Sequence, residues 1–136
     1  IGFDKDENSQ VISGYDGEIS LAFFGGNEHH RNIVNRIEKE ISGKYSNKIS
    51  IHYEPCYIGN SSNWGRKLED YRKIIEKSDL VIIQRDIRTG LGGHLRDYAE
   101  DKWFASTFQG KASILKKIEY ACAFYIKNIQ GEKIAA

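Results

Sequence analysis

The fold is decided by residues 19–30, which read ISLAFFGGNEHH. The apolar run Ile19–Phe24 is typical of a strand buried on both faces, as the strands of parallel sheets are. Gly25 and Gly26 end the run and predict a tight turn, and Asn27 is a good N-cap for a following helix. A strand that passes through a glycine turn into a helix is typical of an α/β sheet. We therefore expect the binding surface of the protein at this turn.

The same alternation of strand and helix recurs along the whole chain. Apolar or alternating runs predict four strands, at residues 19–24, 48–54, 79–83 and 103–107, and apolar residues at helical spacing predict a helix after each of them. Such alternation implies βαβ units with right-handed crossovers. We predict a three-layer, Rossmann-like or flavodoxin-like α/β fold. Its four mainly parallel strands have the order 2-1-3-4, with helices on both faces of the sheet.

The length of 136 residues predicts a single domain with one core. We place this domain at residues 19–130, after a lead-in or linker at 1–18 and before a tail at 131–136. Within the lead-in, Val11-Ile12 is a candidate short edge strand that pairs with the strand after it. The chain begins at Ile1 rather than at a methionine, which indicates either a piece of a longer protein or a trimmed chain.

Composition argues against several classes of protein. Lys and Arg number 20 against 19 Asp and Glu, and this balance argues against a nucleic-acid module, which usually has a basic face. No apolar run approaches the roughly 20 residues that span a bilayer, so we expect no membrane partner. Cys56 and Cys122 fall in different predicted elements without metal-type spacing, which indicates reduced thiols in a cytoplasmic protein. We expect neither a metal nor a cofactor.

The candidate binding site lies where the strand order switches, between the first and third strands. Ligands of open α/β sheets bind beyond the carboxyl ends of the strands at such a point. Glycines let a ligand approach the backbone, and a helix N-terminus favours an anion such as phosphate. The alternative is a tight turn that binds nothing, because the glycine spacing matches neither the dinucleotide fingerprint nor a P-loop. The candidate ligand-binding residues are Gly25, Gly26, Asn27, His29, Arg85 and Ser106.

Catalysis at the same edge is a second interpretation. His30 or His94 would act as general acid and base, with Asp86 as its partner. A hydrolase acting on a nucleotide or a phosphoester is the reaction class that these groups favour. Against it stands the ordinary role of a histidine as a helix-surface or capping residue.

The last predicted helix supports a third interpretation. Its apolar stripe is wide, running from Ile114 to Ile129, and exceeds what one sheet face requires. This helix would then form a homodimer seam, or a docking surface for the remainder of a longer chain.

Several of these motifs resemble those of the DUF2325 group, a family of small bacterial α/β domains. Phe24-Gly25-Gly26 with His29 or His30 is similar to the family's first strand and turn, and residues 78–83 are similar to its acidic turn and buried strand. Gly93-His94 is similar to its loop histidine, and residues 102–107 to its last strand. The resemblance covers about Ser20 to Ile129 by sequence pattern. It implies a small bacterial α/β domain and brings no established activity, so the expected role, a ligand-binding or sensor module that binds a small anionic ligand, rests on the glycine turn and the polar strand ends.

Overall fold

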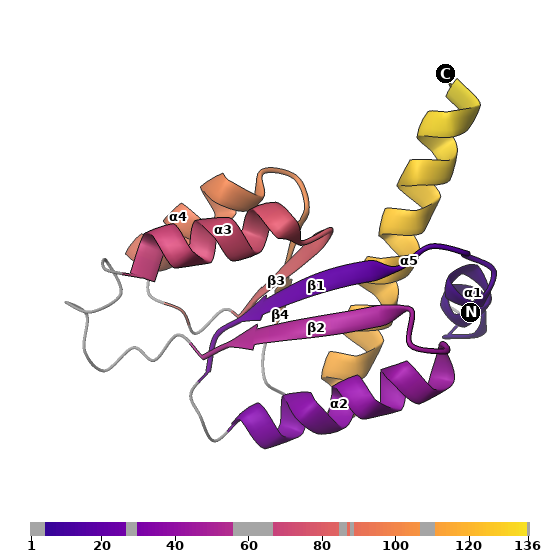
Figure 1. Cartoon of the computed structure of the whole chain (residues 1–136), viewed down its shortest axis with the longest axis horizontal. Coiled ribbons are helices and arrows are strands. Elements are labelled where there is room, and N and C mark those ends of the chain that lie inside the picture. The colour runs from indigo at the N-terminus through magenta and orange to yellow at the C-terminus, as the bar shows by residue number, and fades with distance from the viewer. Residues whose placement is uncertain are drawn as a thin grey trace.

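The computed structural model describes residues 5–26, 30–55, 67–84, 87, 89–106 and 111–135. Five helices and four strands lie in these ranges (Figure 1). They are α1 (Lys5–Ser13), β1 (Ile19–Phe24), α2 (Arg31–Lys44), β2 (Ile49–Glu54), α3 (Leu68–Lys77), β3 (Leu80–Gln84), α4 (Thr89–Ala99), β4 (Trp103–Ser106) and α5 (Lys111–Ala135).

The four strands form one parallel sheet in the order β2-β1-β3-β4. Both the predicted strand order and the parallel α/β class are therefore confirmed. The arrowheads of β1 and β2 point toward the end of the sheet at which α2 begins (Figure 1). The carboxyl ends of the strands and the start of α2 thus share one edge of the molecule.

Helices cover both faces of the sheet, and each face has its own buried cluster. On one face α2, α5 and α1 pack against side chains such as Leu21, Phe23 and Ile82. On the other face α3 and α4 pack against Ala22, Val81 and Ile83. Consecutive residues of β1 and β3 go to opposite clusters, as the two-residue period of a strand requires. This double burial explains why residues 21–24 of β1 and 80–83 of β3 are continuously apolar.

A buried carboxylate joins α2 to α5 within the first cluster. Glu119 is 5% exposed, and its Oε2 accepts hydrogen bonds from the Tyr45 hydroxyl and from Lys44 Nζ, the latter at 2.8 Å. The hydrogen bond to Glu119 raises the pKa of Lys44. Burial is the main cause that raises the pKa of Tyr45. A buried carboxylate with two donors is satisfied, so it fixes how the two helices pack.

The expected strand at Val11-Ile12 is wrong, because both residues lie in α1. Ile12 is fully buried in the cluster beneath α5, and α1 packs mainly against α5. The β-branched side chains favour a strand in isolation. Here the gain from docking a helical turn on α5 outweighs that preference.

The expected start of α2 also differs from the structure. The N-cap position is His30 rather than Asn27, and its side chain makes no capping hydrogen bond. Gly43 lies inside the helix, which ends at Lys44, and the reversal is made by Ser46 and Asn47 with φ of 55° and 60°. Asparagine visits this left-handed region more readily than most residues, which explains how the chain turns without a glycine there.

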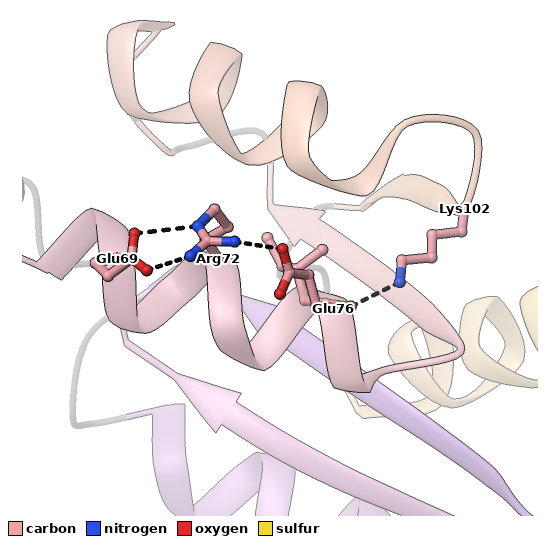
Figure 2. A network of polar contacts seen from close by, with 5 residues as sticks. Glu69, Arg72, Glu76 and Lys102 are labelled. Atoms are coloured by element: carbon pink, nitrogen blue, oxygen red, sulfur yellow. Dashed lines mark hydrogen bonds and ion pairs between the residues drawn. The ribbon is translucent and has the colours of Figure 1, made fainter.

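The end of α3 is fastened to the start of β4 by one lysine (Figure 2). Lys102 Nζ donates to the carbonyl oxygens of Ile75 and Ser78, at 2.6 and 2.7 Å. Figure 2 shows the Lys102 side chain extending to the end of α3. A cation at a helix C-terminus also offsets the negative end of the helix dipole. Along the exposed side of α3, Arg72 lies between Glu69 and Glu76 and pairs with both (Figure 2). Such exposed pairs contribute little to stability.

Candidate functional site

The glycine turn after β1 adopts a backbone conformation that other residues rarely adopt. Gly25 and Gly26 have φ of 129° and 72°, which explains why both positions are glycine. The turn is held to β2 on one side. Gly25 N–H donates to the carbonyl of Glu54 at 3.1 Å, and the Tyr53 hydroxyl donates to the carbonyl of Gly25 at 2.6 Å. The turn is therefore a fixed part of the sheet edge.

Beside this turn, β3 ends in a buried polar side chain. Gln84 is 1% exposed, and among the described residues neither its Nε2 nor its Oε1 has a hydrogen-bond partner. Phe24 pairs with Ile83 in the sheet register, so the next residues along, Gly25 and Gln84, are also neighbours. Burying an amide without partners is unfavourable by roughly 1–3 kcal/mol in proteins. Nearly all buried polar groups of native proteins have a hydrogen-bond partner, which can be a protein group, an ordered water or a bound ligand.

Ser106 continues the row across the sheet edge. It pairs in register with Gln84 and is 9% exposed. Because side chains alternate along a strand, Gln84 lies on the same face as Ile82, and Ser106 on the same face as Phe104. Both point to the α2 and α5 side of the sheet. Three strand ends thus contribute one row: the Gly25 backbone, the Gln84 amide and the Ser106 hydroxyl.

The first turn of α2 adds positive charge above this row. The guanidinium carbon of Arg31 lies 5.5 Å from the ring centre of Tyr53, and Tyr53 itself holds the glycine turn. His30, half-buried, occupies the N-cap position with helical backbone angles. The N–H groups of a first helical turn point along the helix axis and carry partial positive charge. The edge therefore combines a cation, a helix N-terminus and a polar row.

His94 lies elsewhere. It is exposed in the middle of α4, and its ring centre is 6.3 Å from that of Tyr98 on the next turn. The α4 helix packs on the opposite face of the sheet from α2, so the two candidate histidines belong to opposite layers. The remaining predicted site residues, Asn27, His29, Arg85 and Asp86, lie outside the described residues. The hydrolase interpretation, which needs Asp86, stays a prediction.

Gln84 and Arg31 are absent from the residues that sequence reasoning selects. One signal could have found Gln84. The third strand reads LVIIQ, and a polar residue at the carboxyl end of an otherwise apolar buried strand lies at the edge where such folds bind ligands. Arg31 gives no such signal, because a charged residue in a first helical turn is common on solvated surfaces.

Other features of the described residues lie apart from this edge. A hollow of about 270 Å³ lies between α3 and β2, lined in part by Ser20, Ser50 and His52. A second, of about 260 Å³, lies beside β4 and α5. In the ranges that the structure covers, no group of three His, Cys, Asp or Glu side chains could hold a metal ion. Nor does any helix there have the length and apolarity to cross a membrane.

Comparison with known proteins gives no match: no family model fits the chain, and neither a curated protein nor a solved structure matches it.

Proposed function

We propose that the protein binds a small anionic ligand, nucleotide-like or phosphate-like, at the carboxyl edge of the sheet. The observation that carries this proposal is Gln84. Its carboxamide is buried and unpartnered in the described part of the chain, and it lies beside the glycine turn at the β1–β3 switch. A ligand that supplies a donor and an acceptor would relieve the unfavourable burial of this amide.

The anionic character of the ligand follows from the groups around the row. Arg31 supplies a full positive charge, and the start of α2 supplies N–H groups aligned with the helix dipole. Gly25 and Gly26 carry no side chains that would keep a phosphate from the backbone. Ser106 adds a hydroxyl that can donate to a phosphate oxygen.

The role that suits such a site is that of a ligand-binding or sensor domain in a larger, cytoplasmic bacterial protein. The bacterial source rests on the resemblance to the DUF2325 group, and the cytoplasmic location rests on the reduced-thiol interpretation of the cysteines. Cys122, buried and free, accords with that interpretation. A binding role needs no catalytic histidine, so the separation of His30 from His94 does not affect it.

The test is thermal unfolding with inorganic phosphate, AMP and ATP added separately to the purified chain. A ligand present at 100 times its Kd stabilises the folded state by roughly 2.7 kcal/mol, which is a measurable rise in Tm. Arg31→Gln should reduce that rise, whereas Arg36→Gln, an exposed site further along the same helix, should leave it unchanged. The proposal fails if none of the three ligands raises Tm, or if both variants respond as the unaltered protein does.

A further inference from the structure

The two edges of the sheet are built differently. Along β2, the side chains that face the α3 side are polar, and His52 pairs with Glu54 at 2.9 Å. Charged groups on an edge strand discourage pairing with another chain. The strand at the other edge, β4, reads WFAS and is only half-buried over its first three residues. Among the described residues, no strand pairs with its outer side.

Aromatic side chains extend this open edge onto α5. Tyr120 and Phe124 are 48% and 45% exposed, and they are the exposed large apolar side chains of the described chain. Both contact Phe104 edge-on, with ring centres 6.2 and 5.8 Å from it. Together, Phe104, Tyr120 and Phe124 form what we call the aromatic edge. A contiguous apolar patch beside an unpaired strand is typical of an interaction site.

We infer that the aromatic edge and β4 form the interface of a homodimer, in which the two sheets join through antiparallel β4 strands. A second copy fits because an antiparallel strand pair is related by a two-fold axis. The combined sheet would have eight strands with β4 of each copy at the centre. This inference does not depend on the proposed ligand site, which lies at the carboxyl edge.

The ladder within the sheet determines the register of this pair. Val81 N–H donates to the carbonyl of Lys102 at 2.9 Å, so the backbone groups of Lys102 and Phe104 bond toward β3. Residues alternate in a ladder. The backbone groups of Trp103 and Ala105 therefore point outward.

With the two-fold axis at Phe104, Trp103 of one copy lies opposite Ala105 of the other. The two residues then exchange both of their hydrogen bonds, and so does the symmetry-related pair. Phe104 faces its own counterpart as the non-hydrogen-bonded pair, whose side chains approach most closely.

Charges at the two ends of the edge support the same arrangement. Lys117 lies one turn before Tyr120 on α5, with its Nζ 5.6 Å from the Tyr120 ring centre. Asp101 lies at the other end, where it lines the hollow of about 260 Å³ together with Phe124 and Asn128. A two-fold axis at Phe104 reverses one copy against the other. Lys117 of each copy is thereby placed toward the hollow that contains Asp101 of its neighbour.

The test is the association state of the purified chain, measured by sedimentation velocity across a range of concentrations. We expect a dimer. Lys117→Glu should raise the dimer Kd at least about tenfold, because in each half of the interface it places a carboxylate opposite Asp101 of the other copy. Lys116→Glu, the same charge change at the neighbouring exposed position, should leave the Kd unchanged. Combining Lys117→Glu with Asp101→Lys should restore dimerisation.

A backbone variant separates this interface from any other. Ala105→Pro removes an outward N–H that the monomer does not use, and proline is tolerated on an edge strand. The variant should be monomeric with an unchanged far-ultraviolet circular dichroism spectrum. Three results would overturn the inference: a chain that is monomeric at all concentrations, a dimer that survives both Lys117→Glu and Ala105→Pro, or a failure of the charge exchange to restore the dimer. Phe124→Ser is a milder variant with the same expected direction, should the proline variant unfold.

Discussion

Replacing Gln84 by methionine should make the free protein more stable. Gln84 is buried, and no described residue accepts from its Nε2 or donates to its Oε1. Methionine is unbranched and similar in length, so it fills the same space without a polar group. Removing the buried amide should stabilise the fold by roughly 1–3 kcal/mol, the range found for unpaired polar groups in proteins.

The measurement is urea unfolding followed by circular dichroism, supported by a thermal scan. For a chain of this length, 1 kcal/mol corresponds to about 4 °C in Tm, so the expected rise is roughly 4–12 °C. The matched control is Ile83→Met, at the preceding position of β3, which is 4% exposed. Such a volume-conserving apolar exchange should be neutral or destabilising by less than roughly 1.5 kcal/mol.

A destabilised Gln84→Met variant would contradict the prediction. A loss of more than about 1 kcal/mol on Gln84→Met would mean that the amide is hydrogen-bonded in the free protein. The row at the strand ends would then have no unsatisfied group for a ligand to pair with. The proposed function predicts that Gln84→Met is more stable than the unaltered protein but shows no rise in Tm with ligand. Binding sites are commonly less stable than a fully optimised fold would be.

Three further predictions concern the fold. Burial raises the pKa of the Cys122 thiol to about 12 from 9.0. The unfolded thiol therefore loses its proton at lower pH than the folded one, and the free energy of unfolding falls as pH rises from 9.0 toward 12. In urea titrations Cys122→Ala should make this fall shallower, and an unchanged slope would contradict the assignment. Lys102→Met removes both hydrogen bonds to the end of α3 and should destabilise the folded protein by roughly 1–2 kcal/mol. Lys77→Met, at an exposed position, should have little effect. Equal urea midpoints for the two variants would count against the capping role of Lys102. Ile12→Ala leaves a cavity at a fully buried site beneath α5 and should destabilise the folded protein by roughly 2–5 kcal/mol. If the variant loses no more stability than Val11→Ala, at a half-buried position, α1 does not dock on α5.

The order and class of the sheet could be predicted from sequence because burial on both faces leaves a clear pattern. Residues 21–24 and 80–83 are continuous apolar runs, and each precedes a helix with a single apolar stripe. Parallel strands with right-handed crossovers admit few arrangements of such units. The lead-in helix could not be predicted, since Val11 and Ile12 prefer strands locally and the contact that makes them helical is with α5, at the other end of the chain.

The location of the candidate site could be predicted in outline, whereas its residues could only be predicted in part. The glycine turn and Ser106 do lie in one row, because the carboxyl ends of parallel strands share an edge. Gln84 is not among the predicted residues because the apolar pattern ends at Ile83. Whether an amide at the next position is solvated or buried without partners depends on the neighbouring strands and on the helices that cover them. His94 illustrates the converse: its place near a strand end in sequence does not bring it to the polar row, because α4 packs on the other face.

The most direct test of the proposed binding site is the side-chain amide signal of Gln84 in a ¹H–¹⁵N NMR spectrum, assigned by its absence in Gln84→Met. AMP and inorganic phosphate would each be titrated into the labelled protein. If the ligands bind at the proposed site, the Gln84 amide pair shifts together with the backbone signals of Gly25 and Gly26. The backbone signal of His52, whose side chain lies on the α3 side of β2, should stay unchanged. If the Gln84 and glycine signals stay in place at millimolar concentrations of both ligands, the ligand does not bind at this edge of the sheet.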